Sequence, residues 1–129
     1  MKVKMGTIYI SKGGAAMAIE MQNLISEYVR AVRKIYGHHL KQVILYGSYA
    51  RGDYTKDSDV DLMLLVDLDE MELEKYSDAL SELGFDYNVE HNIWMMPIVI
   101  NRKNFFKWSD AYPFYKNVKT EGISLYETA

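Results

Sequence analysis

The sequence predicts a single α/β (α+β) domain with a small mixed β-sheet flanked by helices, and three patterns support this fold class. Apolar residues at three- and four-residue spacings predict a helix from Met17 to about Tyr36. Two short apolar runs, Val43–Tyr46 and Val60–Val66, predict buried strands. Helical and extended patterns then alternate to the end, without repeats or a linker among the 129 residues.

The beginning of the chain is the least determined part. Residues 1–16 are expected to form an N-terminal extension with a candidate strand at Ile8–Ile10, and residues 17–129 are expected to form the domain itself. Alternative start sites at Met5, Met17 and Met21 leave the true beginning of the protein open. Gly37 is expected to end the first helix.

The second half of the chain predicts further elements in order. A helix from about Glu70 to Leu83 is expected, with Asp67–Asp69 as its cap and Gly84 as its end. A third strand is expected from about Asn88 to Ile100, interrupted or bent at Pro97. The last elements expected are short helices and a final extended piece, at Arg102–Trp108, Tyr112–Thr120 and Ile123–Tyr126.

The composition excludes several classes of protein. The chain has no cysteine, which excludes a disulfide scaffold and cysteine-based metal or nucleophile chemistry. The net charge is −3, from 15 basic and 18 acidic residues, which argues against a nucleic-acid partner. The sequence has neither a run of about 18 apolar residues nor a signal-peptide pattern at its start, so we expect a cytoplasmic protein without membrane contact.

One segment of the chain has the residue pattern of a functional site. Gly47-Ser48 follows the first predicted strand, and ten residues then separate Ser48 from Asp59-Val60-Asp61, which opens the next strand. Glycine lets the backbone approach a ligand closely, and amides at a helix start favour anions. Carboxylates two residues apart on a strand share a face and repel each other unless a hard cation lies between them, and Mg²⁺ suits such oxygen ligands beside a phosphate. The segment therefore predicts a phosphate-binding loop facing a metal-binding pair.

Each half of this pattern is common alone, since Gly-Ser after a strand is usually a turn and Asp-x-Asp is often a solvated strand end. Their combination at the ends of two neighbouring buried strands favours the functional interpretation. For Arg51 two roles stay open: it neutralises phosphate charge, or it pairs with Asp53 or Asp57 and braces the loop.

This segment resembles the signature of the DNA polymerase β-like nucleotidyltransferase superfamily, and most closely that of the minimal nucleotidyltransferases. Their pattern of Gly-Ser-x-Ala-Arg-Gly, a short loop and Ser-Asp-x-Asp-Leu is matched in full by Gly47, Ser48, Ala50, Arg51, Gly52, Ser58, Asp59, Asp61 and Leu62. The resemblance implies a polymerase β-like palm core and nucleotidyl transfer. It assigns the triphosphate to Gly47 and Ser48, and it assigns Mg²⁺, two ions in this family, to Asp59 and Asp61.

The family often has a third carboxylate on the next core strand. In the strand predicted here, Glu90 is the one candidate, near the strand's beginning, and an ordinary exposed glutamate is the alternative. The catalytic set implied by the resemblance is therefore Asp59, Asp61 and Glu90.

Three functions follow as hypotheses. The short chain and full motif resemble the antitoxins of HEPN/MNT toxin–antitoxin pairs, which implies AMP transfer from ATP to a tyrosine of a HEPN ribonuclease partner. The unclear third carboxylate supports an alternative, a degenerate module that neutralises a partner by contact. A small-molecule nucleotidyltransferase, working as a homodimer, is the third, and whether the chain forms a homo-oligomer stays open.

Overall fold

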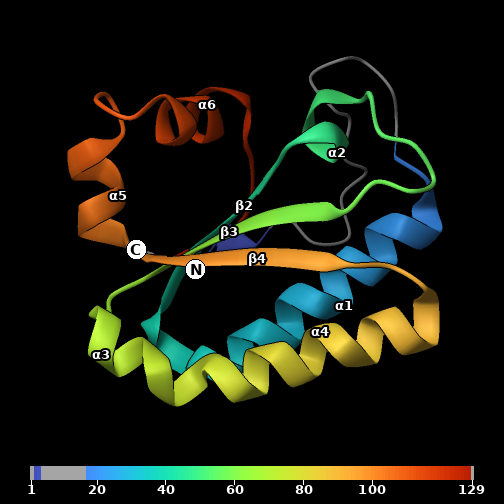
Figure 1. Ribbon diagram of the computed structural model, residues 1–129, viewed down its shortest axis with the longest axis horizontal. Helices are drawn as coiled ribbons and strands as arrows, with labels where there is room; N and C mark the ends of the chain where they lie inside the picture. The colour runs from blue at the N-terminus through green and yellow to red at the C-terminus, as the bar shows by residue number, and fades with distance from the viewer. Residues whose placement is uncertain (1, 4–16, 129) are drawn as a thin grey trace.

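The computed structural model describes residues 2–3 and 17–128, and in this part of the chain five strands form one mixed sheet (Figure 1). The strands lie in the order β1-β5-β2-β3-β4. β2 pairs antiparallel with both β3 and β5, β1 pairs antiparallel with β5, and β3 and β4 run parallel. Their bounds are Lys2–Val3 for β1, Leu40–Tyr46 for β2, Val60–Val66 for β3, Met95–Asn101 for β4 and Ile123–Glu127 for β5. The predicted mixed sheet is confirmed, whereas the candidate strand at Ile8–Ile10 lies outside the described residues.

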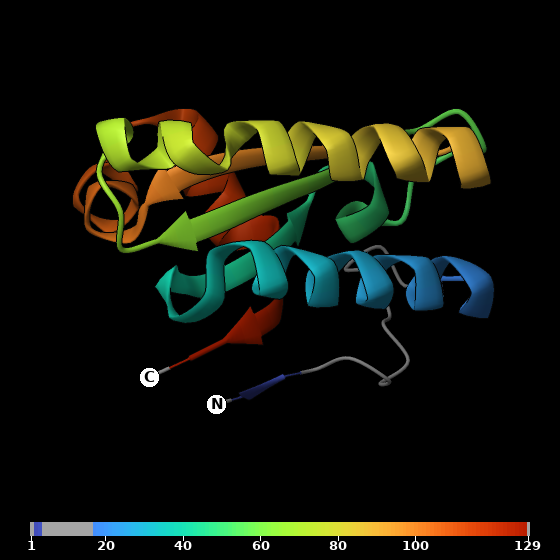
Figure 2. The same ribbon diagram turned by 90° about the horizontal axis from the view of Figure 1, so that it is seen from below.

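Helices cover both faces of the sheet. α1 (Ile19–Tyr36) and α4 (Ser77–His91) lie side by side and antiparallel on one face, as Figure 2 shows. On the other face lie α5 (Arg102–Trp108) and α6 (Pro113–Glu121), whereas α2 (Ser48–Arg51) follows the end of β2 and packs Tyr49 and Ala50 into the core on the α1–α4 face. The short segments η1 (Gly37–His39), α3 (Glu70–Leu73) and η2 (Glu74–Tyr76) connect these elements. None of the described helices is both long and apolar enough to cross a membrane.

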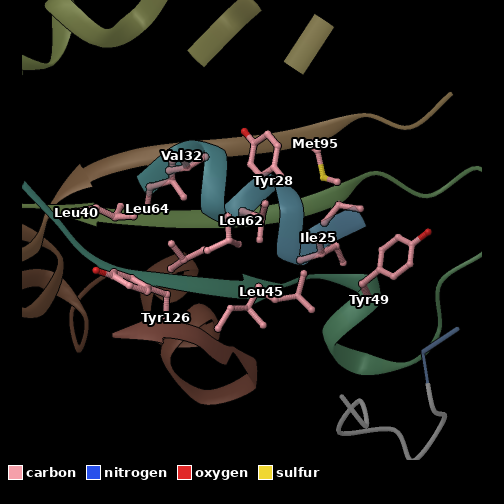
Figure 3. Packing of buried hydrophobic residues seen from close by; sticks show 14 of the residues in the cluster. Ile25, Tyr28, Val32, Leu40, Leu45, Tyr49, Leu62, Leu64, Met95 and Tyr126 are labelled. Atoms are coloured by element: carbon pink, nitrogen blue, oxygen red, sulfur yellow. The ribbon is translucent and has the colours of Figure 1, made fainter. Parts of the chain in front are cut away.

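The sheet separates two apolar cores because alternate residues of a strand point to opposite faces. On the α1–α4 face, Leu62 and Leu64 of β3 pack in one cluster with Tyr28 and Val32 of α1 (Figure 3). On the other face a smaller cluster forms from Ile44, Met63, Leu65, Phe105 and Val118. Asp61 is on the strand face of Met63, so the smaller core ends where the candidate site begins.

The structure corrects the boundaries predicted around Gly84. The helix continues through Gly84, whose φ is not positive, and ends at His91, where Asn92 takes the left-handed conformation at φ 53°. Asparagine adopts this conformation more readily than most residues, so it replaces glycine as the helix end. The third strand therefore begins at Met95 rather than near Asn88, and it runs through Pro97 without interruption.

Candidate active site

The end of β2 turns directly into α2 through Gly47. Gly47 has φ 74° and ψ −156° and occupies the position before the first residue of α2. Its carbonyl accepts the N–H groups of Ala50 and Arg51, both at 3.0 Å. The first N–H groups of a helix have no acceptor within it. Ser48 is the first residue of this short helix, and it lines the pocket described below.

Gly47 lies against the carboxylate of Asp61. In the antiparallel register of β2 and β3, Asp61 is the partner of Tyr46, the residue before Gly47. A Cβ atom on Gly47 would collide with Oδ2 of Asp61 and would lie 3.1 Å from its Cγ. The structure thus brings together the two halves of the motif, and it shows why glycine is needed between them.

Asp59 is placed by the loop that precedes β3. The side-chain oxygen of Ser58 accepts the N–H of Thr55 at 2.8 Å, and the N–H of Ser58 returns to the carbonyl of Thr55 at 3.1 Å. Val60 then joins the sheet by donating its N–H to the carbonyl of Trp94 at 2.9 Å. Asp59 consequently lies one residue before β3, exposed, rather than on the strand as predicted.

The negative charge of Asp61 is unfavourable in its surroundings. Its pKa is raised, first because the residue is partly buried and second because Asp59 adds negative charge, while Arg51 acts in the opposite direction. Burial also raises the pKa of Tyr46 to about 12, with a further contribution from the charge of Asp61. A cation bound between Asp59 and Asp61 would relieve both effects.

Arg51 bridges two carboxylates at the edge of the site. Its Nε lies 3.2 Å from Oδ2 of Asp53, and its Nη1 lies 3.6 Å from Oε2 of Glu121. The hydrogen bond and charge of Asp53 raise the pKa of Arg51. The loop-bracing role expected for Arg51 is therefore seen with Asp53, and Glu121 is a second partner that the sequence did not indicate.

A pocket of about 390 Å³ joins these residues into one site. Gly47, Ser48, Arg51 and Asp61 line it from the α2 and β3 side; the remaining lining residues are Tyr46, Phe114, Asn117, Val118 and Glu121. The sequence analysis missed this second wall, which α6 supplies. In the sequence, the segment from Pro113 onward resembles the end of the minimal nucleotidyltransferases, less specifically than the motif does, and this resemblance is the signal that could have indicated the wall.

Glu90 is not on the strand where the sequence placed it. It lies in the last turn of α4, its side chain is 70% exposed, and it lies 3.7 Å from Nε2 of His91. α4 packs on the face of the sheet opposite to that of Asp61. Within residues 17–128, no group of three or more histidine, aspartate or glutamate side chains is arranged to hold a metal ion. The structure therefore does not bring Glu90 to the aspartate pair.

Comparison with known protein families identifies the family of this chain. The sequence model of the nucleotidyltransferase domain family matches residues 25–117, which include both halves of the motif and most of the fold. The chain belongs to this family. It is a nucleotidyltransferase, and a nucleoside triphosphate is the donor substrate that this family implies.

Individual relatives agree with the family. The protein MJ0604 of Methanocaldococcus jannaschii, provisionally named a protein adenylyltransferase, is 33% identical over 81% of this chain and 97% of its own length. The protein adenylyltransferase MntA of Thermococcus cleftensis is 34% identical over 52% of this chain and 71% of its own length. A solved structure from Sulfolobus solfataricus, provisionally titled a nucleotidyltransferase, superposes with a TM-score of 0.51 at 19% identity, over 95% of this chain and 93% of that one. That likeness supports the fold.

The residues present fit a divalent cation. Asp59 and Asp61 offer carboxylate oxygens, the ligands that Mg²⁺ takes together with phosphate oxygens and water. The glycine at position 47 keeps open the space beside Oδ2 of Asp61 that a side chain would fill. Burial first, and the charge of Asp59 second, raise the pKa of Asp61, and a cation bound to the two carboxylates would offset both.

Proposed function

We propose that this nucleotidyltransferase moves AMP from ATP to a hydroxyl of an acceptor protein. The acceptor proposed is a tyrosine of a HEPN ribonuclease toxin, to which this chain would be the antitoxin. The observation that supports the proposal is the contact of Gly47 with the carboxylate of Asp61, because both residues line one pocket together with Ser48. The names of MJ0604 and MntA as protein adenylyltransferases support a protein acceptor.

The chain's own residues orient the donor. The N–H groups at the start of α2 and the hydroxyl of Ser48 would bind oxygens of the triphosphate, because they are donors at the mouth of the pocket. The acceptor oxygen attacks the α-phosphorus, the bond from that phosphorus to the bridging oxygen breaks, and pyrophosphate leaves with the electron pair. The acceptor proton passes to solvent.

Asp59 and Asp61 would hold Mg²⁺, two ions in the family's usual form. When bound, Mg²⁺ neutralises the charge of the triphosphate and of the departing pyrophosphate. What the protein contributes is position and charge, which a small scaffold is able to supply.

A phenol is the acceptor that this site suits best. β4, the strand beside Asp61, carries Met96 at the position level with it and no acidic residue, so the strand offers no general base to the acceptor. A tyrosine hydroxyl ionises near pH 10 and is a far stronger acid than the hydroxyl of serine or threonine. An acceptor that needs little help to ionise compensates for the absent carboxylate.

The test is transfer of label from ATP. The wild-type protein is incubated with α-labelled ATP, MgCl₂ and a purified HEPN-family ribonuclease, and the ribonuclease is analysed by gel and mass spectrometry. We expect a mass increase of one AMP on a tyrosine of the ribonuclease, and none with Asp61→Asn. An unlabelled ribonuclease with wild-type protein that binds ATP would refute the proposal for this acceptor.

A second candidate function is neutralisation of a partner by contact alone. The absence of a third acidic ligand near Asp59 and Asp61 among residues 17–128 favours it. The two functions differ in one result. A contact module would neutralise the ribonuclease equally well as wild type and as Asp59→Asn, and it would do so without ATP.

A further inference from the structure

The two strands that flank Asp61, β2 and β4, give it different neighbours on its two sides. On the β2 side, its neighbour is Tyr46, and the pocket walls come from β2, α2, β3 and α6. On the β4 side, the parallel register makes Met96 the partner of Asp61 and Ile98 the partner of Met63. Because paired residues of neighbouring strands point to the same face, Met96 and Ile98 lie on the face of Asp61. We call these two residues the β4 ledge.

The β4 ledge is apolar and exposed. Met96 is 45% exposed and Ile98 is 42% exposed, although the strand partner of Ile98, Met63, is fully buried under α5 and α6. Trp94, which precedes β4, is 50% exposed. β4 carries no charged residue from Met95 to Asn101. The β4 ledge is therefore an uncharged apolar surface that adjoins the carboxylate of Asp61 on the side away from the nucleotide pocket.

The edge of β4 is unsuited to sheet extension. Trp94 turns its carbonyl toward β3, where it accepts the N–H of Val60. Backbone groups alternate in direction along a strand, so Pro97 turns outward at the edge of the described sheet. Proline has no N–H to donate and blocks an added strand at that point. An occupant of this side must therefore contact the side chains of the ledge, which argues against pairing with β4 of a second copy.

We propose that the β4 ledge is the docking surface for the acceptor, and that the acceptor hydroxyl belongs to a tyrosine with apolar neighbours in its own chain. This inference rests on the proposed function. The donor fills the β2 side of Asp61, and the acceptor oxygen must reach the α-phosphorus from the other side for an in-line displacement. The ledge is the described surface continuous with Asp61 on that side, and its chemistry selects an apolar segment.

The experiment compares two peptides as acceptors. One is an acetylated, amidated Gly-Leu-Tyr-Leu-Gly and the other is Gly-Ser-Tyr-Ser-Gly, each incubated with α-labelled ATP and MgCl₂. Partial burial of the leucines predicts a KM about fivefold or more lower for the leucine peptide with wild-type protein. In the double variant Met96→Ser/Ile98→Ser, we expect the two KM values to agree within about twofold, with kcat and the KM for ATP unchanged.

Val89→Ser is the matched control. Val89 is 65% exposed on α4, away from Asp61, so its replacement removes exposed apolar surface without touching the ledge. We expect it to keep the wild-type preference. Equal KM values for the two peptides with wild-type protein would overturn the inference and leave the proposed function standing. A ledge variant that keeps the preference, or that loses only self-association in light scattering, would overturn it as well.

A second measurement separates docking from catalysis. The chain has two tryptophans, so Trp108→Phe leaves Trp94 beside the ledge as the one fluorescent reporter of that type. If ATP binds but neither peptide receives AMP, transfer to the ribonuclease in the assay above decides the proposed function separately. Titration with the leucine peptide then decides the inference: a saturable change in Trp94 emission that is absent with the serine peptide supports docking, and no change overturns it.

Discussion

Replacing Gly47 with alanine puts a methyl group where the carboxylate of Asp61 lies. The added Cβ collides with Oδ2 of Asp61, and the φ of 74° is unfavourable for any residue with a side chain. We expect Gly47→Ala to lower the free energy of unfolding in urea by about 1–3 kcal/mol and to abolish the thermal shift caused by ATP with MgCl₂.

Gly84→Ala is the control for this prediction. Gly84 lies within α4, and nothing lies within 4 Å of the Cβ that alanine would add. Alanine in a helix interior is favoured over glycine by about 0.5–1 kcal/mol. This variant should therefore be more stable than the wild type and bind ATP normally. A Gly47→Ala variant that keeps both the wild-type free energy of unfolding and the thermal shift caused by ATP would contradict the contact with Asp61.

Asp61 predicts a pH dependence of stability. Burial and the charge of Asp59 raise its pKa in the folded protein, so ionising it costs more there than in the unfolded chain. The cost is fully present above the raised pKa and disappears below the ordinary value of about 3.9. We expect Asp61→Asn to be more stable than wild type in urea at pH 7, with a gain that shrinks as the pH falls. A loss of stability at pH 7 would contradict this.

Glu121 is expected to hold Arg51 away from the donor. Its Oε2 lies 3.6 Å from Nη1 of Arg51, and both residues line the pocket. The pair is exposed, so solvent and salt screen it and it is weak. Glu121→Gln should therefore lower the Kd for ATP by up to about fivefold at low salt, measured by calorimetry. Asn117→Ala tests whether any change in the α6 wall has this effect; a lower Kd in that variant too would exclude the charge as the cause.

For individual residues, the sequence predicted the motif but not the other residues that line the pocket. Gly47, Ser48, Asp59 and Asp61 could be found because glycine conformation and carboxylate spacing are local properties. Glu121 and Tyr46 could not, because they reach the pocket through packing of α6 and through the register of β2 against β3.

α4 is the element that the sequence described least well, and Glu90 was misplaced with it. Gly84 is a local helix-ending signal, but Leu80, Leu83 and Tyr87 pack on the same core on both sides of it. That packing offsets the modest cost of one glycine, so the helix continues to His91. The local sequence pattern shows Gly84 but not the packing on the core that keeps the helix going past it.

The position of α4 gives a prediction for catalysis. Glu90 lies on a helix that packs against the opposite face of the sheet, whereas Asp61 lines the pocket. We expect Glu90→Gln to transfer AMP within about twofold of wild type, and Asp59→Asn to lose about two to three orders of magnitude. Initial rates with labelled ATP measure both. Comparable losses in the two variants would place Glu90 at the site after all.

The whole molecule shows why its fold class could be predicted. The apolar runs predicted the buried strands β2 and β3, and the elements from Ile19 onward follow the predicted order, although the boundaries around Gly84 are shifted. The pairing of β5 between β1 and β2 could not be predicted, because strand order depends on contacts between distant segments. That same pairing brings the chain back so that α6 closes the pocket over Gly47.

The most direct test is calorimetric titration of the protein with ATP in the presence of MgCl₂ and again in EDTA. If the Gly47–Ser48 turn and the aspartate pair form one nucleotide and metal site, ATP binds at one site per chain with MgCl₂. Binding should then weaken strongly in EDTA and in Asp59→Asn/Asp61→Asn, and stay unchanged in Glu90→Gln. Binding of ATP with equal affinity in wild type and in the aspartate double variant would contradict the site.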